Sequence, residues 1–200
     1  MNKVTLAAVA LVLALGFQMA QADMISLGNS TLNVANVGGH NGPFGTVHIS
    51  LNVTTQVATF TFTANSGGGY HFIGNAAAGI NASTTFDGFT LITDSDFKGL
   101  DSGTVDGFGT FNLILDNNNA STFVDQISFS IHNTGTNWAT SADVLAFNSK
   151  GADAVAHVNF GNGVTGFVAE TGPVTVPDGG TTAMLLGMAL SAFGLIRRFF

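Results

Sequence analysis

The residues best suited to hold a metal ion are the acids of an internal segment that reads TDSDFKGLD. Asp94 and Asp96 have the D-x-D spacing that brings two carboxylates to one side of a loop, and Asp101 follows; calcium prefers such oxygen ligands. The segment is not an EF-hand, because Lys98 and Val105 stand at the fifth and twelfth positions, where oxygen ligands are needed. A weak calcium site at Asp94, Asp96 and Asp101 is the alternative interpretation. We favour a solvated acidic turn, which is what short charged runs usually form, and so predict no cofactor.

The other residues with catalytic potential form no recognisable motif. The five histidines lack HxH or HxxxH spacing, so a zinc site would have to be assembled from distant strands. Cysteine is absent, which excludes disulfides, thiolate ligands and cysteine nucleophiles. Glutamate is scarce and no G-x-S-x-G elbow occurs, so a secreted hydrolase is the least favoured class. We predict that the protein is not an enzyme.

Two aromatic residues with a polar group, Tyr70 and Trp138, leave two interpretations open. On a β-sandwich such side chains stack on sugar rings, but a lone Trp is more often part of the core.

The composition favours strands and argues against a nucleic-acid partner. Only 8% of the residues are charged, against roughly 25% in a typical soluble domain. The 26 Gly and 18 Phe, with many Thr, Ser and Asn, favour short strands joined by tight turns. A net charge of −7 is a poor match for a polyanion.

Alternation of apolar and polar residues predicts the strands. The clearest are 46–53 and 56–63, which we expect to pair as a hairpin. The positions expected to face the core in this hairpin are Val47, Ile49, Leu51, Val53, Phe60 and Phe62. Further strands are expected at 86–92, 109–115, 123–131, 144–147, 154–160 and 165–168. Evenly spaced short strands predict an all-β fold, either an antiparallel β-sandwich or a jelly roll.

Residues 1–22 have the features of a secretory signal peptide. Lys3 supplies the positive start, 4–17 is an uncharged apolar run, and Ala20 and Ala22 are the small residues that signal peptidase requires. Cleavage would leave Asp23 as the mature amino terminus. A buried helix or an uncleaved anchor is the alternative, but the apolar run is short for a span of about 20 residues.

The last residues form a second targeting segment. Val176-Pro177-Asp178-Gly179-Gly180 precedes an uncharged apolar stretch, 181–196, and then Arg197 and Arg198. We predict a transmembrane helix within 181–200, with the basic end on the cytoplasmic side and the body outside. An ordinary C-terminal membrane anchor is the alternative.

This three-part tail resembles the PEP-CTERM class of bacterial sorting signals, and in particular its VPDSG-CTERM variant. Val176, Pro177, Asp178 and Gly180 match the variant, whereas Gly179 stands where it has Ser. The resemblance covers about the last 25 residues, the length such a tail needs. It implies recognition and cleavage near the motif by an exosortase, a transpeptidase-like membrane enzyme, and delivery of the body to the cell surface or into exopolysaccharide.

These features predict a chain of four parts: the signal peptide 1–22, expected to be helical, a β-sandwich ectodomain 23–172, a linker with the sorting motif 173–180, and the transmembrane helix 181–200. The expected function is that of an exported structural protein of the cell surface or extracellular matrix, held in the membrane only transiently. A secreted carbohydrate- or calcium-binding module is the alternative.

Overall fold

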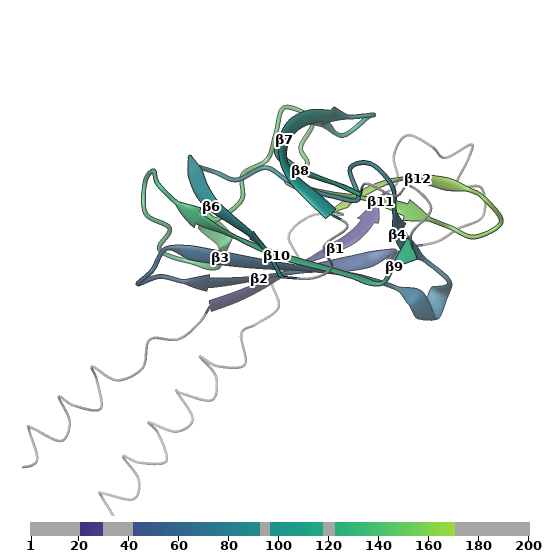
Figure 1. Ribbon diagram of the computed structural model, residues 1–200, viewed down its shortest axis with the longest axis horizontal. Helices are drawn as coiled ribbons and strands as arrows, with labels where there is room; N and C mark the ends of the chain where they lie inside the picture. The colour runs from purple at the N-terminus through teal and green to yellow at the C-terminus, as the bar shows by residue number, and fades with distance from the viewer. Residues whose placement is uncertain (1–20, 30–41, 93–96, 118–122, 171–200) are drawn as a thin grey trace, which may run out of the picture. The chain divides into compact units, whose positions relative to one another are not determined.

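A computed structural model of the chain describes residues 21–29, 42–92, 97–117 and 123–170 (Figure 1). Most of the predicted signal peptide and the whole of the predicted sorting tail lie outside this part of the chain. The helices expected in those two segments are therefore not among the elements described below.

The described residues form strands and two short 3₁₀ turns, and no α-helix occurs among them. The strands are β1 (Gln21–Asn29), β2 (Gly45–Asn52), β3 (Val57–Ala64), β4 (His71–Ile73), β5 (Ala78–Ile80), β6 (Phe86–Leu91), β7 (Phe97–Val105), β8 (Gly109–Asn117), β9 (Phe123–Val124), β10 (Gln126–Asn133), β11 (Ala154–Asn159) and β12 (Thr165–Glu170). The 3₁₀ turns are η1 (Ser66–Gly68) and η2 (Ser141–Asp143).

All these strands belong to one antiparallel sheet. Its order is β6-β10-β3-β2-β1-β12-β11-β5-β8-β7, with β4 paired to β11 and β9, so β9 also joins the sheet. Figure 1 shows that the sheet curls, so that β2, β3 and β10 lie opposite β8 and β11. The prediction of an all-β antiparallel fold is confirmed.

The sheet is continuous where two separate sheets were expected, and β1 is the reason. This strand lies between β2 and β12 and so joins the two halves of the sheet. Its register with β12 shifts between Leu27 and Asn29, and such an irregularity increases the local twist and bend of a strand. We did not predict β1, because its sequence begins in the segment assigned to the signal peptide.

The predicted hairpin is present as β2 and β3. Val47 lies opposite Phe62 and Ile49 opposite Phe60, and all four side chains are buried. The turn between the strands is fixed by the Asn52 side chain, which accepts hydrogen bonds from the backbone N–H groups of the two following threonines at 3.1 Å. The alternation in the sequence therefore determined both the pairing and the buried face.

The core between the two halves is rich in phenylalanine. Phe129 on β10 stacks on Phe60 with ring centroids 5.1 Å apart, and on Phe62 at 6.1 Å. Aliphatic residues of the opposite half, including Leu113 on β8 and Val158 on β11, belong to the same buried cluster. Closely arranged aromatic pairs add to the free energy gained by burying their area, by roughly 0.5–1.5 kcal/mol each.

The strand expected at 144–147 is not formed. Val144 ends η2, and Leu145 makes only an isolated bridge to Ala82. The apolar residues there are used for packing, because Val144 is fully buried. A short apolar run does not distinguish a strand from a buried loop.

Candidate functional site

Of the three acids of the possible calcium site, only Asp101 is among the described residues. Asp94 and Asp96 lie outside the described residues. The backbone of Asp101 lies in β7, opposite Ile114 of β8, so this acid stands on a strand and not in the expected acidic loop. Within 21–29, 42–92, 97–117 and 123–170, no three His, Cys, Asp or Glu side chains are arranged to hold a metal ion. The calcium site stays the untested alternative to a solvated acidic turn.

The residues assigned to targeting lie mostly outside the described chain. This holds for Ala20, for the sorting motif Val176-Pro177-Asp178-Gly179-Gly180, and for Arg197 and Arg198. Ala22 and Asp23 belong to β1, so the predicted cleavage site falls in the first residues of the strand that joins the two halves of the sheet. In the described ranges, no helix has both the length and the apolar character needed to cross a membrane.

Tyr70 and Trp138 are core residues and are not available for sugar stacking. Trp138 is 2% exposed and Tyr70 8%. The Trp138 Nε1–H donates to Ser83 Oγ at 3.0 Å, and the Tyr70 ring meets that of Phe44 edge-on at 5.1 Å. The core interpretation of these residues is correct, and the sugar-stacking one is wrong.

Two of the five histidines pair with acids on the surface. His71 Nδ1 lies 2.5 Å from Asp125 Oδ1, and His132 Nδ1 lies 2.8 Å from Asp87 Oδ1. Exposed pairs of this kind stabilise a fold by at most about 1 kcal/mol. His157 differs, because burial lowers its pKa; its ring stacks on Phe167 at 4.5 Å.

The outer face of β2, β3, β10 and β6 carries hydroxyl groups in rows across the strands. One row joins Ser50, Thr59, Ser130 and Thr90, each opposite the next. In a second row Thr61 lies opposite Ser128, and their hydroxyl oxygens are 3.1 Å apart. This face is the polar side of the strands whose other side forms the phenylalanine core. Ser128 itself is buried, so the accessible hydroxyl groups of this face are mainly those of the first row, and the His132–Asp87 pair lies beside them across β10 and β6.

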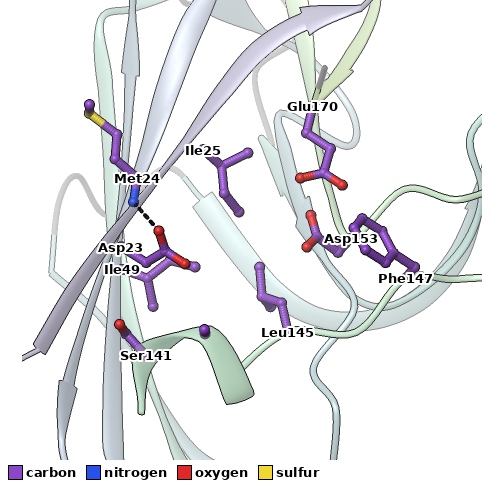
Figure 2. Close-up of a pocket in the computed structure, with 10 residues that line it drawn as sticks. Asp23, Met24, Ile25, Ile49, Ser141, Leu145, Phe147, Asp153 and Glu170 are labelled. Carbon is purple, nitrogen blue, oxygen red and sulfur yellow. Dashed lines mark hydrogen bonds between the residues drawn. The ribbon is translucent and has the colours of Figure 1, made fainter. Parts of the chain in front are cut away.

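A cavity of about 160 Å³ lies between β1, η2, the start of β11 and the end of β12 (Figure 2). Three acids line it: Asp23 on β1, Asp153 just before β11, and Glu170 at the end of β12. The Ser141 side chain and the apolar side chain of Leu145 are also part of its wall. We call this the acid-lined cavity.

Asp153 and Glu170 are the unusual members of this cavity. They are 8% and 6% exposed, and Figure 2 shows their carboxyl groups side by side. Asp153 Oδ1 and Glu170 Oε1 are buried without a hydrogen-bond partner. Carboxylates are rarely buried unless they are paired with a cation or a donor.

This environment changes the protonation of both groups. Burial, followed by the neighbouring Asp153, raises the pKa of Glu170 from its ordinary value of 4.5 to about 8. Burial also raises the pKa of Asp153, although its hydrogen bond with Glu170 acts in the opposite direction. Near neutral pH, Glu170 therefore holds a proton next to the Asp153 carboxyl group.

Sequence reasoning did not select Asp153 or Glu170 as site residues. Each is an acid beside a run of small and apolar residues, in GADAVAHV and TGFVAE. An acid at the edge of a buried strand is the signal that identifies such a residue. Its partner can be named only once the pairing of β11 with β12 is known.

Comparison with known proteins identifies the tail and leaves the body without a match. Residues 175–200 match the family model described as the VPDSG-CTERM motif. No curated protein and no solved structure matches the chain. The chain therefore carries, at residues 175–200, a C-terminal sorting signal of the PEP-CTERM type in the form of the VPDSG-CTERM motif.

Proposed function

We propose that the protein is an exported structural component of the cell surface or of the extracellular matrix. The observation that carries this proposal is the VPDSG-CTERM sorting signal at 175–200. Such a signal suggests an exported, surface-directed protein processed by an exosortase-like enzyme.

The delivery route follows from the order of the segments. Residues 1–22 would act as the signal peptide and be removed by signal peptidase. The apolar stretch of 181–200 would then hold the body outside the membrane, with Arg197 and Arg198 on the cytoplasmic side. The exosortase-like enzyme would finally cut near Val176–Gly180 and release the body from this anchor.

The outer face of β2, β3, β10 and β6, which we call the hydroxyl face, supports a role in which the body contacts polysaccharide. Rows of Ser and Thr can donate and accept hydrogen bonds, as sugar hydroxyl groups do. A low content of charged residues, 8% of the chain, leaves hydrogen bonding as the main polar interaction available. We propose that this face contacts exopolysaccharide and that the body is structural and not catalytic.

Surface delivery is tested by fractionating a host that contains a matching exosortase. The unaltered protein should be found at the cell surface or in the matrix. The double variant Pro177→Ala, Asp178→Ala should stay in the membrane fraction, and Thr182→Ala, a change in the same tail outside the motif, should behave as the unaltered protein does. Equal delivery of the double variant would show that the motif does not direct the protein.

A further inference from the structure

We propose that the acid-lined cavity binds a small organic ammonium ion, a protonated primary amine with a short alkyl group. This inference goes beyond the proposed function, because it does not depend on the C-terminal sorting signal.

The acid-lined cavity lacks hydrogen-bond donors and positive charge for its carboxyl groups. Asp153 Oδ1 and Glu170 Oε1 line the cavity without a hydrogen-bond partner, and Asp23 adds a third carboxyl group. Neither Lys98 nor Lys150, the lysines of the described chain, contributes to its wall. An ammonium group supplies three N–H donors and one positive charge, which satisfies both requirements together.

The remainder of the cavity wall is largely apolar. Ile25, Ile49 and Leu145 line the cavity beside the acids, and these side chains suit an alkyl group. Phe147, which is 56% exposed, is also part of the wall, and aromatic rings attract cations. A volume of about 160 Å³ holds several waters at about 30 Å³ each, which is enough for a short alkylammonium.

These features favour an organic cation over a metal ion. Calcium takes six to eight oxygen ligands, and the acids of the described chain are not arranged to hold a metal. A metal would also leave the apolar part of the wall unused.

The binding should depend on pH, since the ligand must displace a proton. The titratable groups that face the cavity are Asp23 from β1, Asp153 before β11 and Glu170 from β12, while η2 contributes the Ser141 hydroxyl. Burial holds a proton on Glu170 up to a pKa of about 8. The affinity should therefore rise up to about tenfold per pH unit toward pH 8, then level off until the amine loses its own proton near pH 10.4, as a lysine does.

The test is calorimetric titration of the full chain with n-butylammonium at pH 6, 7, 8 and 9. We expect saturable binding with a Kd in roughly the millimolar range, release of a proton below pH 8, and the stated rise in affinity. Glu170→Gln should weaken binding at pH 8 at least tenfold and remove most of the pH dependence. Asp106→Asn, which removes an exposed acid outside the cavity, should change neither.

Titrations with tetramethylammonium and with calcium can contradict the proposal. Tetramethylammonium, which has no N–H donor, should bind at least tenfold more weakly than n-butylammonium. Absence of binding to any ammonium ion at pH 8 by the uncleaved chain, when that chain unfolds cooperatively, would refute the site, and so would tighter binding of calcium that Glu170→Gln abolishes. Cooperative unfolding of each variant is checked by thermal denaturation, so that a failure to fold is recognised.

The ammonium group has two possible sources, which the same titration separates. Cleavage after Ala22 would create an α-ammonium group on Asp23, itself a residue of the wall. The processed chain is compared with Ala20→Leu, a change designed to block signal peptidase. Binding by both forms assigns the cavity to an external amine, whereas binding only by the uncleaved form assigns it to the mature amino terminus; both outcomes support an ammonium site.

Discussion

Glu170 at the end of β12 and Asp153 before β11 place their carboxyl groups side by side in the interior, where each retains an oxygen atom without a hydrogen-bond partner. No cation of the described chain lines this cavity. Burying these two acids without a cation therefore lowers the stability of the fold.

The stability of the body should fall as the pH rises from about 4.5 to about 8. In this window the unfolded chain has released the Glu170 proton, whereas burial keeps it on the folded chain, whose pKa is about 8. The folded state then binds more protons than the unfolded state, so the free energy of unfolding decreases with pH, by at most about 1.4 kcal/mol per unit. Urea denaturation at half-unit intervals of pH measures this slope.

Glu170→Gln supplies the matched comparison for that slope. The variant should be about as stable as the unaltered protein near pH 4.5 and more stable at pH 8, because it has no proton to retain. Asp106→Asn, at an exposed turn, should keep the original slope. A slope unchanged by Glu170→Gln would mean that another group is responsible.

Gln56 should be needed for stability although it lies in a turn. Its Oε1 accepts from the backbone N–H of Trp138 at 2.7 Å, and its Nε2 donates to the Trp138 carbonyl at 3.1 Å. Gln56→Ala leaves these groups of Trp138 without their partners, so we expect a loss of about 1–3 kcal/mol in the free energy of unfolding. Denaturation followed by tryptophan fluorescence measures it, and Gln126→Ala, at an exposed position of β10, should cost less than about 0.5 kcal/mol.

The single tryptophan should not respond to sugars. Because Trp138 is 2% exposed, its fluorescence should be emitted at short wavelength and be weakly quenched by acrylamide. Addition of oligosaccharides should leave the spectrum unchanged even where they bind to the hydroxyl face. A sugar-dependent shift of the emission would contradict the burial of this ring.

Replacing Gly179 by Ser should not slow removal of the tail. Gly179→Ser restores the residue that the VPDSG-CTERM variant has at this position, so removal of the tail should be as fast as in the unaltered chain or faster. The amount of tail-free protein after a pulse of synthesis measures the rate. Slower processing of Gly179→Ser would show that the exosortase of this host prefers glycine.

The parts of the fold that could be predicted are the strands in which apolar and polar residues alternate. The hairpin of β2 and β3 was predicted with its buried side chains, since Phe60 and Phe62 alternate with threonine in a clear pattern. Strand β7 was not predicted, because FKGLDSGTV contains two glycines and four polar residues that weaken the pattern. Strand β5 has only three residues, Ala78–Ile80, too few for any alternation to show.

The acid-lined cavity could not be predicted because its parts come from distant places in the chain. Asp23, Asp153 and Glu170 meet only when β1 and β11 both pair with β12. In the sequence, Glu170 is simply an acid near the linker of the sorting tail. The sorting signal itself was predictable, because its three parts are adjacent and its function depends on their order.

The proposed sorting route is tested most directly by intact mass spectrometry of the protein made in a host with a matching exosortase. It predicts a species that begins at Asp23 and ends near Pro177, recovered outside the membrane fraction. A species that retains Arg198 and Phe200 in the membrane would contradict it, since the tail would then be a permanent anchor.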